Sequence, residues 1–218
     1  QEVKTYAFFT GRNKSWKDAT LYVDSSVYYY SKWLGPYPYN TCTAVEGALR
    51  AGGGMEYPTI TVISAGGAPL MLDLIIAHEV GHNWFYGILG SNERDHPWLD
   101  EGLNSYYERT GLGSLLEPTE NVLLSHLYQE RKDQPINTSP ERFTNMNYAA
   151  IAYLKTAQWM ELMEKTLGKP KFDQAMQDYF QRWKFKHPAP SDLLSTLQAH
   201  SQADLSDYFQ LLDKSGQL

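Results

Sequence analysis

The chain has 218 residues, a formal net charge of −6 at pH 7 and one cysteine. This length allows a core that needs no disulfide or structural metal, and a single cysteine excludes an internal disulfide. The acidic balance argues against nucleic acid as a partner, because phosphate binding requires clustered Lys and Arg.

The first third of the sequence predicts a helix and then a small sheet. Apolar and aromatic residues at helical spacing over 16–33 predict a helix that ends before a Gly-Pro pair. Two short β-branched segments, 41–46 and 59–64, predict strands on either side of the glycine run 52–54. The segment between the strands is therefore expected to bend.

The rest of the sequence predicts helices. Pro69 suits a first helical turn, and apolar residues continue the pattern to residue 85. No apolar run reaches the roughly 18 residues that cross a bilayer, so we expect no membrane-spanning segment in this chain. Later helices, with Ser191 as one N-cap, are expected over 99–109, 120–131, 148–167, 171–185, 191–199 and 205–212.

A small sheet followed by helices is the order of an α+β domain. We expect one domain over residues 1–218, with a small-sheet part over 1–68 and a helical part over 69–218. No signal peptide stands at the start, so we expect this chain to be a fragment of a larger multidomain protein. The compartment stays open.

The strongest chemical signal is the segment His-Glu-Val-Gly-His, in which His78 and His82 flank Glu79. Residues four apart lie on one face of a helix, so the two imidazoles can bind one metal ion. In this motif the glutamate acts as a general base and does not bind the metal. Two ordinary histidines, one capping and one buried, remain the alternative on this motif alone.

A catalytic zinc ion needs three protein ligands and an open position for water. Glu101 is the candidate third ligand, because it begins an expected helix 18 intervening residues after His82. An acidic residue in a first helical turn is also favoured by the helix dipole, and Asp100 could serve that purpose equally well. His96 is a rival ligand, but no spacing rule supports it.

These residues together resemble the aminopeptidase N family of zinc metallopeptidases, the gluzincins. In that family His-Glu-x-x-His is followed after eighteen residues by Glu, inside the segment Trp-Leu-Asn-Glu-Gly. Here residues 98–102 read Trp-Leu-Asp-Glu-Gly, and Trp84 and Phe85 occupy the family's aromatic positions after the second histidine. The resemblance implies a thermolysin-like catalytic domain with a small sheet, a helical lobe and one zinc ion.

The glycine-rich segment before the metal helix resembles the family's Gly-x-Met-Glu-Asn motif. It reads Gly53, Gly54, Met55, Glu56 and Tyr57, so Tyr replaces the usual Asn. The resemblance implies that these first four residues bind substrate and that the Glu56 carboxylate binds its free α-amino group. An exposed loop carboxylate is the alternative for Glu56.

A later segment, Tyr-Leu-Lys-Thr-Ala over residues 153–157, is similar to the family's Tyr-Glu-Lys-Gly-Ala. The resemblance implies that Tyr153 stabilises the oxyanion and that Tyr148, five residues earlier, contacts substrate. The chain has 16 tyrosines, so an ordinary packed aromatic is the alternative for either one.

The resemblance implies a zinc-dependent metallopeptidase that removes N-terminal residues from peptides, packed against N-terminal and C-terminal domains that lie outside this chain. Three alternatives remain. One is an endopeptidase or a hydrolase of another bond, such as an epoxide, on the same site. The second is a catalytically weak zinc-containing binding module, which the intact Glu79 argues against. The third is a helical protein without metal.

Overall fold

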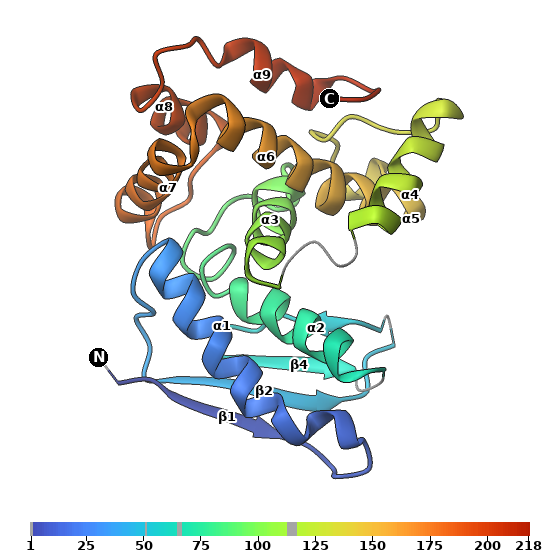
Figure 1. Ribbon diagram of the computed structural model, residues 1–218, viewed down its shortest axis with the longest axis vertical. Coiled ribbons are helices and arrows are strands. Elements are labelled where there is room, and N and C mark those ends of the chain that lie inside the picture. Colours follow the sequence, from blue (N-terminus) through green and yellow to red (C-terminus); the bar gives the residue numbers. More distant parts are fainter. Residues whose placement is uncertain (1, 51, 65–66, 113–116) are drawn as a thin grey trace. The chain divides into compact units, whose positions relative to one another are not determined.

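The structure is a computed structural model that describes residues 2–50, 52–64, 67–112 and 117–218 (Figure 1). It divides the chain into two compact units, residues 1–87 and 88–218. The subdivision expected at residue 68 separates the sheet from the helix that follows it. In the structure that helix packs with the sheet in the first unit.

The first unit contains a mixed β-sheet. Its strands lie in the order β1 (Lys4–Phe8), β2 (Thr41–Gly47), β4 (Ile60–Ser64) and β3 (Gly54–Met55). β1, β2 and β4 are parallel, and β3 runs antiparallel to β4. The two predicted strands are confirmed as β2 and β4, whereas β1 and the very short β3 were not predicted.

Two helices, α1 (Ala19–Trp33) and α2 (Pro69–Gly81), lie side by side on one face of this sheet (Figure 1). A 3₁₀ turn, η1 (Lys14–Asp18), leads into α1. Helices α1 and α2 and the sheet face that they cover enclose a common apolar core. It includes Val23, Val27, Tyr30, Ala44, Ile63, Leu72, Ile76 and Val80. Burial of these side chains is the main stabilising term for the unit.

Helix α2 ends at Gly81, so its predicted extent to residue 85 is wrong. The Asn83 side-chain amide donates to the Val80 carbonyl at 2.8 Å, which satisfies one of the carbonyls that a helix end leaves open. Trp84 then turns inward, is fully buried, and donates its ring N–H to the Gly35 carbonyl at 2.9 Å. Side-chain capping and this inward turn end the helix early.

The second unit is helical. α3 packs on α6 and on the π-helix η4, and α7 packs on α8. The helices are α3 (Glu101–Leu112), α4 (Glu117–Gln129), α5 (Asn145–Asn147), η4 (Tyr148–Lys155), α6 (Thr156–Leu167), α7 (Lys169–Trp183), α8 (Pro190–Ala199) and α9 (Ser206–Gln210), with 3₁₀ turns η2 (Pro97–Leu99), η3 (Pro140–Arg142) and η5 (Leu211–Asp213). Both units together confirm the α+β fold class.

Two details differ from the sequence-based expectation. The predicted helix 148–167 begins as a π-helix and becomes α-helical only at Thr156. Ser191 is not an N-cap, because α8 begins one residue earlier at Pro190. The Asp192 carboxylate accepts the Ala189 N–H at 2.8 Å and caps the helix from inside its first turn.

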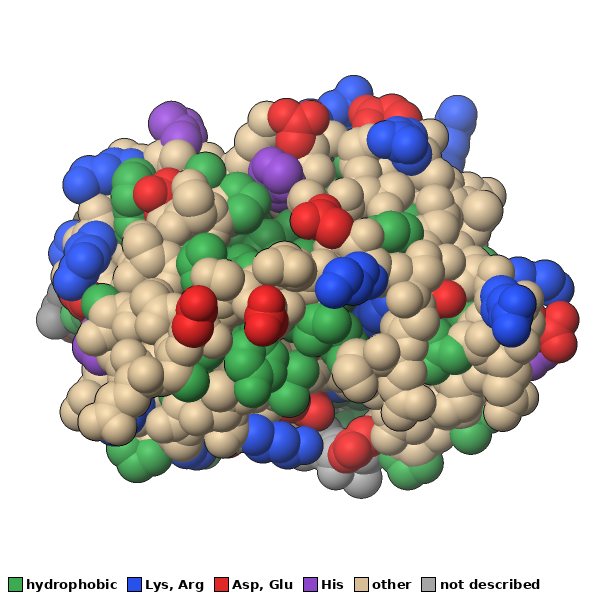
Figure 2. Space-filling model, turned by 90° about the horizontal axis from the view of Figure 1, so that it is seen from above, with side chains coloured by type: hydrophobic (Ala, Val, Ile, Leu, Met, Phe, Trp, Pro, Cys, Tyr) green, Lys and Arg blue, Asp and Glu red, His purple; other side chains and the backbone are tan. Residues whose placement is uncertain are grey.

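Lys and Arg side chains lie among Asp and Glu side chains on the face shown in Figure 2. A polyanion on this face would meet both signs of charge. Within the described residues, no helix combines the length and the apolar character that crossing a bilayer requires.

Candidate active site

The two motif histidines converge at the end of α2. Their Nε2 atoms are 3.1 Å apart, and the rings are nearly perpendicular at 85°. Two nitrogens that each lie about 2.0–2.1 Å from one tetrahedral zinc ion are themselves about 3.3 Å apart. His82 is the C-cap residue, yet it keeps helical dihedral angles (φ −62°, ψ −13°), so the i, i+4 geometry survives the helix end.

Glu79 is buried beside the strand β3. A Cβ atom added to Gly54 would lie 2.3 Å from the Glu79 Cδ and Oε1 atoms. A side chain at position 54 would therefore displace the Glu79 carboxylate, and glycine lets the β3 backbone approach this carboxylate where it stands. The glycine-rich segment and the motif glutamate therefore meet within the first unit.

The turn after β3 carries Glu56, which is half-buried. Met55, the residue before Glu56, is held by Thr61, whose Oγ1 donates to the Met55 carbonyl at 3.0 Å. The Tyr57 carbonyl accepts the Ile60 N–H at 3.1 Å, while the Tyr57 side chain is 50% exposed. Neither contact involves the side chain of residue 57, so the turn tolerates Tyr in place of the family's Asn.

Asn83 is a residue of this region that the sequence did not single out. Its Oδ1 accepts the Thr59 N–H at 2.8 Å and the Tyr37 hydroxyl at 3.3 Å. Thr59 has a positive φ of 68°, a strained conformation for a β-branched residue. Asn83 thus connects the C-terminal end of α2 to Thr59, in the turn that follows Glu56. Its position directly after the second histidine was the only available signal.

Glu101 is the first residue of α3, in the second unit. The next residue, Gly102, faces the π-helix, where an added Cβ would lie 2.2 Å from Thr156 Cγ2 and 2.6 Å from the Ala152 carbonyl oxygen. Glycine is therefore required for α3 to pack this closely on η4. This close packing brings Glu101 to the tyrosines of η4.

Tyr148 and Tyr153 lie together on η4, with ring centroids 5.7 Å apart at 75°. Burial, and then the charge of Glu101 and a hydrogen bond with its carboxylate, raise the pKa of Tyr153 well above its usual value. Burial and the Glu101 charge raise the pKa of Tyr148 to about 12. Both hydroxyl groups accordingly remain protonated donors at neutral pH.

His96, the rival ligand, has a different partner. Its Nδ1 lies 2.7 Å from Asn137 Oδ1, and the Trp98 ring N–H donates to the same oxygen at 3.3 Å. Asn137 in turn donates to Asp213 at 2.9 Å. These contacts give His96 a structural role in joining its loop to the later part of the second unit.

Each unit therefore assembles one group of the expected site residues. The first unit brings together His78, His82, Glu79 and the segment 53–56. The second unit brings together Glu101, Tyr148 and Tyr153. Two converging imidazoles beside a buried glutamate, in an α+β domain, define a domain of the metallopeptidase class.

Comparison with known proteins gives the family. Residues 24–211 match the Peptidase family M1 domain, and the chain belongs to this family. Glutamyl aminopeptidase of Bos taurus is 25% identical over 145 residues, which cover 61% of this chain and 15% of that protein. Aminopeptidase N of Lactococcus lactis subsp. lactis is 22% identical over 180 residues, 74% of this chain and 21% of that protein.

Solved structures agree on the fold. An M1 zinc metallopeptidase from Deinococcus radiodurans superimposes with a TM-score of 0.69 at 18% identity, covering 98% of this chain and 47% of its own. The match to the Peptidase family M1 domain confirms the resemblance drawn from the sequence motifs. This chain spans less than half the length of each of these three proteins.

Proposed function

We propose that this chain is the catalytic domain of a zinc-dependent aminopeptidase, with His78, His82 and Glu101 as the zinc ligands. The observation that carries the proposal is the approach of the two Nε2 atoms to 3.1 Å beside the buried Glu79. Membership of peptidase family M1 and the names of the relatives support the zinc ion and the reaction class.

The donor set suits a catalytic zinc ion. Two imidazole nitrogens and one carboxylate supply three ligands and leave a fourth position for water or substrate. Bound there, zinc supplies Lewis acidity, which acidifies water and polarises a peptide carbonyl. The remaining steps fall to side chains of the protein.

Glu79 acts as the general base in this proposal. Its carboxylate accepts a proton from the attacking water and later delivers that proton to the leaving amine. Burial keeps the carboxylate in one place, and the Gly54 backbone closes one side of it. Water that loses a proton here attacks the carbonyl carbon of the scissile peptide bond.

Tyr153 donates its hydroxyl proton in a hydrogen bond to the carbonyl oxygen as negative charge develops on it. Tyr148 packs against it edge to face and limits its movement. Tyr153→Phe should lower kcat by roughly 10²–10³-fold with little change in KM, because the bond forms mainly in the transition state. Steady-state kinetics on one peptide substrate measure both constants; a change confined to KM would make Tyr153 a binding residue instead.

Glu56 selects substrates with a free N-terminus. Its carboxylate pairs with the α-ammonium group of the substrate, and this contact fixes the scissile bond one residue from the end. The glycines 53 and 54 and Met55 place the backbone beside the substrate. An acetylated peptide has no ammonium group, so the same carboxylate would face a neutral amide.

In the intact protein, Glu56→Ala should reduce the preference for a free over an N-acetylated peptide by about ten- to a hundredfold in kcat/KM, as expected for a hydrogen bond to a charged group. Asp24→Ala is a matched control, since Asp24 is an exposed carboxylate of α1 in the same unit. An unchanged preference in Glu56→Ala would remove Glu56 from amine binding.

The experiment that tests the proposed function is zinc analysis together with turnover of a panel of aminoacyl arylamides and their N-acetylated counterparts. We expect a zinc-dependent preference for the free amines. Equal turnover of blocked peptides would indicate an endopeptidase, and zinc without any turnover would indicate a binding module.

A further inference from the structure

Lys155, the last residue of the π-helix, has a fully buried side chain. Its Nζ donates to Asp133 Oδ2 at 3.1 Å, and the Asp133 side chain is only 3% exposed. Burying two charges costs several kcal/mol per ion, so apolar residues at such positions are often equally stable. The stability of the fold alone does not explain this ion pair.

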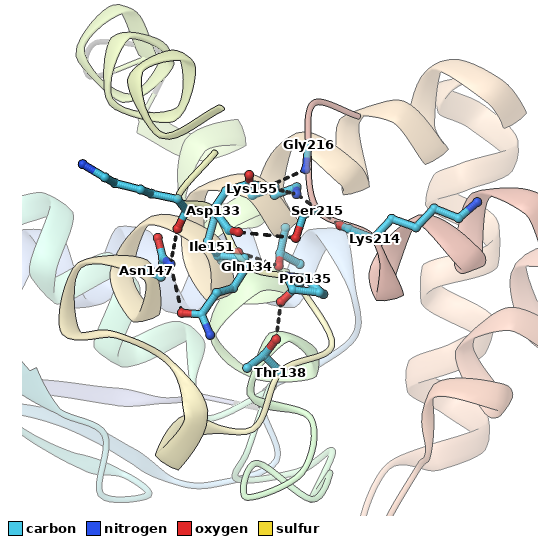
Figure 3. A network of polar contacts seen from close by, with 12 residues as sticks. Asp133, Gln134, Pro135, Thr138, Asn147, Ile151, Lys155, Lys214, Ser215 and Gly216 are labelled. Atoms are coloured by element: carbon cyan, nitrogen blue, oxygen red, sulfur yellow. Dashed lines mark hydrogen bonds and ion pairs between the residues drawn. The ribbon is translucent and has the colours of Figure 1, made fainter. Parts of the chain in front are cut away.

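The ion pair joins three separate segments of the second unit (Figure 3). Lys155 Nζ also lies 3.4 Å from the Lys214 carbonyl oxygen. Asp133 Oδ2 accepts the Gly216 N–H at 2.6 Å, and the Asp133 carbonyl accepts the Ser215 hydroxyl at 3.3 Å. The pair therefore links η4, the segment after α4 and the segment near residue 215.

The N-terminal end of η4 is held by the residues on either side of Asp133. The Asn147 side-chain amide donates to the Lys132 carbonyl at 2.8 Å and to Gln134 Oε1 at 2.9 Å (Figure 3). Three consecutive residues, 132–134, thus bind the residue before η4 and the last residue of η4. The residues of η4 must fit between these two anchors, so the distance between the anchors sets the rise per residue of the helix.

A π-helix is rare and is often found at functional sites. Its hydrogen bonds run between residues five apart, so each residue turns by a smaller angle than in an α-helix. A return to the α pattern would rotate Tyr153 with respect to Tyr148. Tyr153 lies two residues before Lys155, and its hydroxyl interacts with Glu101.

We propose that Lys155 and Asp133 are positioning residues, which hold η4 in its π form and so place the Tyr153 hydroxyl beside Glu101, where it can donate to the carbonyl oxygen of a bound substrate. The proposal rests on the proposed function for its effect on catalysis, but the position of Tyr153 can be measured without any activity.

The first test is kinetic, in the intact protein. Asp133→Asn should lower kcat at least ~10-fold, toward the 10²–10³-fold expected for loss of one oxyanion donor, with KM and zinc content close to the parent. In a Tyr153→Phe background the same change should cause no further loss, because the two residues act through one hydroxyl. An equal loss in both backgrounds would overturn the proposal.

Lys169→Met is the matched control. Lys169 pairs with Asp173 at 2.9 Å, but both side chains are exposed, by 51% and 41%. We expect no change in kcat there, because exposed ion pairs contribute little.

A variant without charges guards against misfolding, since a single buried unpaired charge is strongly destabilising. Lys155→Met combined with Asp133→Leu removes both charges and leaves an apolar contact. This variant should fold and retain zinc, yet show the same loss of kcat. A folded variant with the parent kcat would show that the ion pair is dispensable for positioning.

The second test separates this proposal from the proposed function. Replacing Tyr153 by 3-fluorotyrosine gives a ¹⁹F resonance that reports its surroundings whether or not the protein is active. The resonance should move in Asp133→Asn and in the charge-free variant, and stay in place in Lys169→Met. A resonance unchanged in all three would overturn the positioning role, even if peptidase activity were confirmed.

Discussion

Glu79→Gln should abolish nearly all peptidase activity, with kcat at least ~10³-fold lower, while zinc content stays at the parent level. General base catalysis contributes about 10²–10⁴-fold, and a neutral amide cannot accept the proton of the attacking water. The substitution preserves the size of a side chain that packs directly on Gly54, so the fold should survive. Kinetics and metal analysis on one preparation measure both quantities.

Glu141→Gln is the control for this result. Its carboxylate pairs with Arg94 at 3.0 Å, and both side chains are largely exposed. The control should behave as the parent. A Glu79→Gln protein that kept close to the parent kcat would remove Glu79 as the base, and one that lost its zinc would make Glu79 a ligand.

Glu101→Ala should weaken zinc binding at least ~100-fold and abolish turnover at ordinary zinc concentrations. Loss of a residue that merely supports a metal ligand typically costs 10–100-fold in affinity, and loss of a ligand leaves only two imidazoles on the ion. Competition with a chromogenic chelator measures the affinity. Added zinc should restore activity only in part.

Glu117→Ala tests whether the weaker zinc binding of Glu101→Ala comes from loss of a metal ligand or from loss of an acidic residue at a helix N-terminus. Glu117 also begins a helix, α4, and interacts with the same kind of helix dipole. It should retain the parent zinc affinity. Parent zinc affinity in Glu101→Ala would leave that residue as an ordinary first-turn acid, which is the alternative that its sequence position allows.

The motif residues were predictable because their geometry is local. Four residues of helical backbone bring His78 and His82 onto one face, and this holds even though α2 ends at Gly81. The strands β2 and β4 were also predictable from their β-branched residues. β3 could not be predicted, because a strand of two residues is too short to show alternating apolar and polar side chains. β1 could not be predicted either, because its residues alternate between exposed and partly buried and none is fully buried.

The π-helix could not be predicted from the sequence. Its apolar spacing is that of an ordinary buried helix, and what distinguishes it is the anchoring of Asn147 and Lys155 to residues 132–134. These contacts depend on tertiary structure. Asn83 is a similar case, since its partners Thr59 and Tyr37 are distant in sequence.

X-ray absorption at the zinc edge of the purified, zinc-loaded protein is the most direct measurement of the proposed metal centre. We expect two imidazole nitrogens at about 2.0–2.1 Å and carboxylate and water oxygens at about 2.0–2.2 Å, with loss of one imidazole contribution in His82→Ala. Sulfur or three imidazoles among the zinc ligands, or a spectrum unchanged in His82→Ala, would rule out this set of ligands.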